Sequence, residues 1–346
     1  MEKILLRFES KFAESREDLS AMTMTPGEVL WLGCDENTSI ERLTKTDDKS
    51  FAEHEIFNLT DFIDLPNDSD EEIDIEGMDY AHNYIWLVGS HSLKRSKPKS
   101  KRSDLENIQK MEQIKREDNR YLLARIPVKG EELCKLCEHP ENPDVKLTAA
   151  KLETTKNGNL LIDALLDDPH LSPFLASQIP SKENGFDIEG LAVYQDRIFL
   201  GLRGPVLRGW AIILEISVEE SSPNTLKLKN LGDKLYKKHF VYLSGLGVRE
   251  LAVDGEDLLV LAGPTMDLDG PVRLYRIENG VNLPEESLLK PSPILDIPFG
   301  EGVDHAEGLA FWRKGENEKL LLVVYDSPSQ ERLQGDDGIF ADLFPL

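Results

Sequence analysis

Acidic side chains recur in this chain within a short repeated word, Asp-Ile-Glu-Gly-Leu-Ala or a close variant. Clear copies of the word lie at residues 74–78, 187–192 and 305–310, and altered copies lie at 18–22 and 247–252. Carboxylates that come from several segments suit Ca²⁺, which accepts six to eight oxygen ligands in irregular geometry. We therefore predict a calcium site built from the acidic residues of the clear copies, namely Asp74, Glu76, Asp187, Glu189 and Glu307.

The glutamate position of the word also has a purely structural interpretation. Three glutamates gathered around one axis would repel one another, and raised pKa values, a bound cation or a nearby arginine would relieve that repulsion. Arg249 occupies the glutamate position in one altered copy, and Ser20 occupies it in the other. Alternatively, each glutamate accepts backbone N–H bonds from a neighbouring strand and only holds the fold together. The sequence leaves both interpretations open.

A set of basic residues is expected to face the acidic set. Arg203 and Arg208 stand between glycines in the segment 201–209, at the end of an apolar run. Guanidinium groups in such turns suit bidentate contacts to carboxylate or phosphate. With Arg249, Lys94 and Arg95 they are our candidates for binding a small anionic ligand. The alternative is that the arginines form ion pairs with the acidic residues.

Two histidines are the candidates for acid–base chemistry. His91 follows an apolar run, and His305 begins the last copy of the word. Histidine is the side chain whose ordinary pKa lies nearest to neutrality, so either ring could transfer a proton to or from a bound ester.

The spacing of the word indicates the fold that must position these residues. Successive copies are roughly 60 residues apart, except for one step of about twice that length, and such periods are typical of repeat architectures. Short apolar runs follow each copy, as at 29–34, 84–89 and 258–263. We predict an all-β chain that forms a single β-propeller domain over residues 1–346, with five four-stranded blades. A sixth blade within the double step is the alternative. The segment at 4–8 is expected to pair with the segment at 338–346 and close the ring.

Two segments look like helical insertions into the propeller. Residues 93–118 contain a basic run at 94–102 and then an apolar stripe at a spacing of three, from Leu105 to Ile114, as expected of an amphipathic helix. Residues 153–185 contain a second helix-forming stretch that prolines limit. The basic run is either an anion clamp or a solvated loop.

Composition restricts the partners. Lys and Arg number 40 against 64 Asp and Glu, which gives a net charge of −24. This field repels polyanions, so we expect neither nucleic-acid nor anionic-membrane binding. No apolar stretch approaches the roughly 20 residues of a membrane span, and three cysteines do not suggest a disulfide framework. A cytoplasmic protein is expected.

Several segments together resemble a bacterial domain-of-unknown-function family, number 3616. They are Asp187-Ile-Glu-Gly-Leu-Ala, Gly201-Leu-Arg-Gly-Pro, Arg249-Glu-Leu-Ala-Val-Asp-Gly, Leu261-Ala-Gly-Pro-Thr and Ala341-Asp-Leu-Phe-Pro-Leu. The family has no established reaction. The acidic word more distantly resembles that of phytase-like and esterase-like propellers, and this resemblance implies calcium beside an anionic substrate.

Two functions are compatible with these patterns. The first is divalent-cation-dependent binding or hydrolysis of a small anionic ester or phosphoester at the mouth of the propeller channel. The second is a non-catalytic scaffold, in which the glutamates are structural and the insertions recognise a protein partner.

Overall fold

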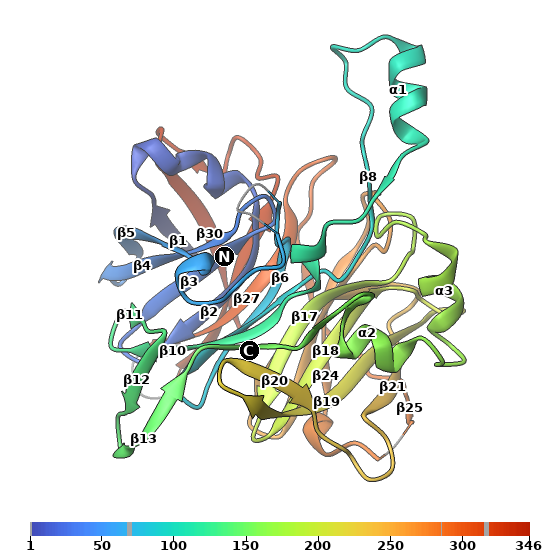
Figure 1. The fold of residues 1–346 in the computed structure, drawn as a ribbon. Helices are drawn as coiled ribbons and strands as arrows, with labels where there is room; N and C mark the ends of the chain where they lie inside the picture. Colours follow the sequence, from blue (N-terminus) through green and yellow to red (C-terminus); the bar gives the residue numbers. More distant parts are fainter. Residues whose placement is uncertain (1, 68–70, 285, 315–317) are drawn as a thin grey trace.

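A computed structural model describes residues 2–67, 71–284, 286–314 and 318–346 of the chain. Within these ranges the strands form antiparallel groups of four (Figure 1). The first group is β2 (Leu19–Thr25), β3 (Val29–Cys34), β4 (Ser39–Asp47) and β5 (Ser50–Asn58), and the second is β6 (Ile75–Ala81), β7 (Tyr84–Gly89), β10 (Leu123–Lys129) and β14 (Ala150–Leu152). The third is β17 (Asp187–Tyr194), β18 (Arg197–Gly204), β19 (Trp210–Ser222) and β21 (Tyr236–Tyr242). The fourth is β22 (Gly247–Asp254), β23 (Asp257–Gly263), β24 (Val272–Ile277) and β26 (Pro293–Ile297), and the fifth is β27 (His305–Lys314), β28 (Glu318–Asp326), β30 (Gly338–Pro345) and β1 (Glu2–Arg7).

The first strands of these groups lie side by side around a closed cycle. In the described part of the chain β2 contacts β6, β6 contacts β17, β17 contacts β22, β22 contacts β27, and β27 contacts β2. All of them begin with a copy of the repeated word. The prediction of an all-β chain is confirmed, and the arrangement is propeller-like.

Close packing between these inner strands explains the glycine of the word. A Cβ atom at Gly77 would lie 2.8 Å from the backbone nitrogen of Leu191, and one at Gly190 would lie 3.0 Å from that of Leu251. Real Cβ atoms rarely come so near to backbone, so the glycine lets neighbouring inner strands approach. The glycine of the repeated word is therefore explained by the close contact between neighbouring inner strands that closes the ring.

The hydrophobic core lies between neighbouring groups. Trp31 of β3 and Ile85 of β7 belong to one buried cluster, and Leu259 of β23 and Leu321 of β28 belong to another. Both faces of β3 and β7 are buried, which explains why their sequences are continuous apolar runs.

The two ends of the described chain meet in the fifth group. β1 pairs antiparallel with β30 along its whole length, from Glu2 opposite Leu343 to Arg7 opposite Gly338. Its other edge pairs with β5 of the first group. Ile4 and Leu6 are fully buried there.

The first insertion forms an arm that projects from the body of the molecule (Figure 1). It contains β8 (Lys94–Arg95), α1 (Asp104–Met111) and β9 (Ile114–Lys115), and β8 pairs with β9 at its base. Ser103 and Glu106 form a capping box at the start of α1, which buries none of its residues.

The second insertion packs against the third group. It contains β15 (Thr154–Thr155), β16 (Gly158–Asn159), α2 (Leu160–Leu165) and α3 (Ser172–Ser177). The Asn159 side chain accepts hydrogen bonds from the backbone N–H groups of Leu161 and Ile162 in the first turn of α2, and Leu161 and Leu165 are buried. No helix in the described ranges is long and apolar enough to cross a membrane.

The remaining strands join or extend these groups. β20 (Thr225–Leu228) pairs with both β19 and β14, and so connects the second and third groups. The others are β11 (Glu132–Leu133), β12 (Leu136–His139), β13 (Asn142–Thr148), β25 (Leu288–Leu289) and β29 (Leu333–Gln334).

Candidate functional site

The glutamate positions of the word meet at the centre of the ring, and each sits at a β-bulge. The register between the first and second strands of a group shifts on either side of Ser20, Glu76, Glu189, Arg249 and Glu307. A bulge adds one residue to a strand and redirects its side chain. Strict alternation of side chains along the strand therefore does not hold through the word.

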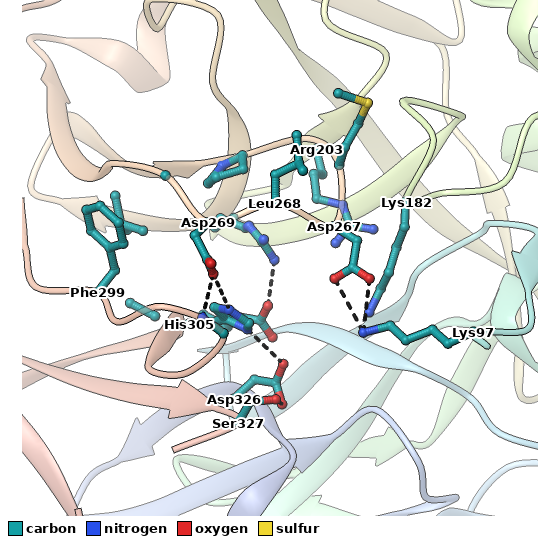
Figure 2. A pocket seen from close by; sticks show the side chains of 18 residues that line it. Lys97, Lys182, Arg203, Asp267, Leu268, Asp269, Phe299, His305, Asp326 and Ser327 are labelled. Carbon is teal, nitrogen blue, oxygen red and sulfur yellow. Dashed lines mark hydrogen bonds and ion pairs between the residues drawn. The ribbon is translucent and has the colours of Figure 1, made fainter. Parts of the chain in front are cut away.

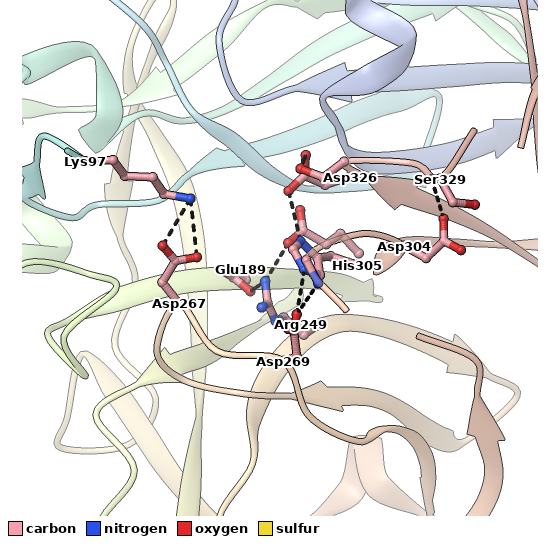
Figure 3. A network of polar contacts seen from close by, with 12 residues as sticks. Lys97, Glu189, Arg249, Asp267, Asp269, Asp304, His305, Asp326 and Ser329 are labelled. Carbon is pink, nitrogen blue, oxygen red and sulfur yellow. Dashed lines mark hydrogen bonds and ion pairs between the residues drawn. The ribbon is translucent and has the colours of Figure 1, made fainter. Parts of the chain in front are cut away.

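Two arginines lie among the acidic groups and neutralise them. Arg203 of β18 lies 2.6 Å from Asp187 and 2.5 Å from Glu189. Arg249 lies 3.2 Å from Glu189 and 2.5 Å from Glu307 (Figure 3). Both guanidinium groups are buried, with exposed fractions of 5% and 9%. They pair with the acidic residues, which is the alternative that the sequence left open.

The acids outnumber the arginines, and burial leaves some of them protonated near neutrality. Burial raises the pKa of Glu307 to about 8, although Arg249 lowers it. Burial also raises the pKa of Asp187 to about 6 against the effect of Arg203. The pKa of Glu76 is raised well above its usual range, first by burial and then by the charges of Glu189 and Glu307.

Four of the five acidic residues proposed to bind calcium, Asp74, Asp187, Glu189 and Glu307, form ion pairs with arginines. Among the described residues no group of three or more His, Cys, Asp or Glu side chains is placed to hold a metal ion. Arg203 and Arg249 occupy the positions between the carboxylates, and Asp74 pairs with Arg120 instead. Calcium binding by Asp74, Glu76, Asp187, Glu189 and Glu307 stays a prediction.

Two adjoining cavities open at the end of the ring where the inner strands begin, which we call the mouth. The first has a volume of about 330 Å³ and reaches Arg249, His305 and Glu307. The second has a volume of about 370 Å³ and reaches Asp74, Glu76 and the base of the arm. Both are lined by Lys97, Lys182, Arg203 and Asp267. An ion pair of 3.0 Å between Lys97 of the arm and Asp267 crosses the mouth between them (Figure 2).

His305 lies in the first cavity between two aspartates. Its Nδ1 is 3.6 Å from Asp326 and its Nε2 is 3.5 Å from Asp269 (Figure 3). The polar contact with the Asp326 carboxylate raises the pKa of His305, with a further contribution from Asp269 and against the effect of burial. The imidazole therefore keeps its proton to higher pH than an isolated histidine.

Four other candidates from the sequence lie elsewhere or already have partners. His91 is buried and lines neither cavity; its Nδ1 donates to the Gly89 carbonyl, and its Nε2 accepts from Asn159 at 2.7 Å. Burial lowers the pKa of His91 to about 4, so the ring is neutral. Lys94 and Arg95 line the second cavity but pair with acids, Lys94 with Glu72 and Glu117, and Arg95 with Glu183. Arg208 is exposed in a turn and lines neither cavity.

The structure adds residues that the sequence did not single out. Lys182 follows α3 in the sequence and lines both cavities. Arg120 lies just after the first insertion, lines the second cavity and pairs with Asp74. Neither belongs to the repeated word, so no sequence signal placed them at the axis. Asp269, Asp326 and Ser327, in contrast, could be found from the sequence, because they occupy turns after apolar runs that are analogous to the turn of Arg203.

A family model described as a protein of unknown function (DUF3616) matches residues 18–342. The chain belongs to this family. No curated protein matches it.

Solved structures resemble the chain weakly. They include virginiamycin B lyase from Staphylococcus aureus, at 9% identity and a TM-score of 0.39, with 100% of this chain and 99% of that chain covered. An exo-1,5-alpha-L-arabinanase from a bovine ruminal metagenomic library has 8% identity and a TM-score of 0.41, over 97% and 94% of the two chains. The PQQ-bound aldose sugar dehydrogenase from Streptomyces coelicolor has 10% identity and a TM-score of 0.39, over 99% and 98%. At this level of similarity they carry no argument about activity.

Proposed function

We propose that the strand groups are the blades of one five-bladed propeller and that its mouth binds a small anionic molecule. The observation that carries the proposal is the position of Lys182. This ammonium group lines both cavities, and in the part of the chain that the structure describes it makes no ion pair. The other cations of the two cavities, Lys94, Arg95, Lys97, Arg120, Arg203 and Arg249, are paired with carboxylates.

Electrostatics supports an anion at this position. Burial raises the pKa values of Asp35, Asp187 and Glu307 overall, but the charge of Lys182 acts in the opposite direction on all three and also favours the ionised forms of Asp267 and Asp326, so it acts over the whole mouth. Glu307, whose pKa is raised to about 8, further reduces the negative charge beneath Lys182 when it is protonated, and the raised pKa of His305 favours its charged form. The mouth is therefore a place where an anion can approach a chain whose net charge is −24.

Two proton-carrying groups lie beside the proposed anion site. His305 and Glu307 line the first cavity, and both have raised pKa values. If the ligand is an ester, these are the groups placed to give a proton to its leaving oxygen. Hydrolysis would extend the binding function and is not required by it.

The test compares anion binding by the wild type and Lys182→Ala. Inorganic phosphate and acetate are titrated by calorimetry and by thermal shift at constant ionic strength, because a bound ligand raises the melting temperature. Loss of a charge-assisted contact is expected to weaken binding about 10-fold. The matched control is Lys129→Ala, which removes an exposed lysine that lines neither cavity. No response to either anion, or an equal response in Lys182→Ala, would refute the proposal.

A further inference from the structure

The first cavity carries apolar side chains on its rim, although its floor is charged. Met266, Leu268 and Phe299 line it, and they have exposed fractions of 44%, 62% and 46%. Large apolar side chains exposed together, beside polar groups, are typical of a binding site. A ligand that contacts only the charged floor would leave them in water.

Fixed loops present these side chains. Met266 and Leu268 belong to the loop between β23 and β24, and Phe299 follows β26. Asp269 of the first loop accepts a hydrogen bond of 2.9 Å from the Gly302 backbone and so joins the two loops. Asp267 is held by Lys97, and Met266 forms a β-bridge with Glu183. The apolar rim is therefore anchored on both sides.

The apolar rim and Lys182 face the same space. Figure 2 shows Phe299 and Leu268 around the cavity, with Lys182 on its far side. Figure 2 also shows His305 between Phe299 and Lys182, and Arg249 lines the same cavity. An anionic group near Lys182 would thus leave the rest of the ligand against Leu268 and Phe299.

We propose that the ligand of this mouth is a small amphipathic anion, with a carboxylate or phosphate group at Lys182 and an aromatic or short alkyl body on the apolar rim. This inference rests on the proposed anion-binding function and adds the chemical class of the ligand. The cavity volume of about 330 Å³ limits the size, because ligand pockets span about 300–1,000 Å³ and this one lies near the lower end. One aromatic ring or a short chain fits that volume better than a long-chain lipid.

The experiment pairs each anion with its apolar derivative. Affinities for phenyl phosphate and inorganic phosphate, and for benzoate and acetate, are measured by calorimetry on the wild type, Phe299→Ser and Leu268→Ser. In the wild type the aromatic member of each pair is expected to bind about 10-fold more tightly, because it buries apolar surface on both partners. That preference should largely disappear in both variants, while their affinity for phosphate and acetate stays unchanged.

Leu288→Ser is the matched control, since Leu288 is 68% exposed and lines neither cavity. All three side chains are exposed, so the variants should melt at the wild-type temperature without ligand. Equal affinities within each pair, or a preference that survives both substitutions, would overturn this inference and leave anion binding intact. Absence of any anion response would instead overturn the proposed function, and the inference with it.

Discussion

At Glu307, burial and the charge of a neighbouring arginine act on the pKa in opposite directions. Arg249 lies 2.5 Å away and favours the charged carboxylate. Burial favours the neutral acid and has the larger effect, so the pKa rises from its ordinary value of 4.5 to about 8. In the unfolded chain the same group ionises at its ordinary pKa.

A pH dependence of stability follows. Below about pH 4.5 Glu307 is protonated in both states. As the pH rises from 4.5 towards 8, the unfolded chain loses this proton while the folded protein keeps it, so the free energy of unfolding falls by up to about 1.4 kcal/mol per pH unit. Urea unfolding at pH 5, 6, 7 and 8 should therefore show a steeper decline in the wild type than in Glu307→Gln. Glu278→Gln changes an exposed acid and is the control; parallel curves for the wild type and Glu307→Gln would contradict the argument.

The sequence was sufficient to bring Glu76, Glu189, Arg249 and Glu307 to one axis, because they occupy the same position in a repeated word. It could not show the bulges, which depend on the pairing of first and second strands. It left open whether the arginines bind a ligand or the acidic groups. The position of Lys182 at the mouth could not be predicted from the sequence, because it depends on how the second insertion packs against the ring.

At the scale of single elements, the arm shows that a periodic apolar pattern can extend beyond the helix that it predicts. The spacing of Leu105, Ile108, Met111 and Ile114 predicts one apolar helical stripe, yet α1 ends at Met111 and Ile114 lies in β9. The backbone leaves the helix there because β9 pairs with β8 at the base of the arm. Leu105 and Ile108 are 65% and 54% exposed. Recognition of a protein partner by this arm stays a prediction.

Removing residues 99–110, the part of the arm beyond Lys97, should leave the fold of the rest of the protein intact. Replacing residues 99–110 with a short Gly-Ser linker removes a helix with no buried residue and keeps both Lys97 and the Arg95 contact to the Met111 carbonyl. Exposed elements of this kind contribute little, so the free energy of unfolding should change by no more than about 0.5 kcal/mol. Thermal and urea unfolding measure the change. Asn159→Ala is the contrasting variant, because it removes the N-cap of α2 and a buried contact to His91, and should cost about 1–2 kcal/mol. A large loss on replacing the arm would show that the arm supports the ring.

At the scale of the whole molecule, closure depends on contacts between residues far apart in the sequence. The first strands touch around a cycle, and β1 fills the gap between β5 and β30. The all-β class could be predicted from apolar runs and from the period of about 60 residues. The parallel pairing of β1 with β5, and of β14 with β20, could not, because neither pairing leaves a periodic pattern in the chain.

Because β1 pairs with both β30 and β5, its inward side chains should contribute as much to the free energy of unfolding as those of a central strand. Ile4 is fully buried in the cluster that joins the first and fifth groups, whereas Lys3 points outward on the same strand. Ile4→Ala should lower the free energy of unfolding by about 2–4 kcal/mol, the range for a buried aliphatic side chain replaced by alanine, and Ile4→Val by about 1 kcal/mol. Lys3→Ala should change it by less than about 0.5 kcal/mol. Equilibrium urea unfolding of the three variants measures this order. If the ring holds without β1, Ile4→Ala will be as stable as Lys3→Ala, and the fifth group would then position its part of the mouth with β27, β28 and β30 alone.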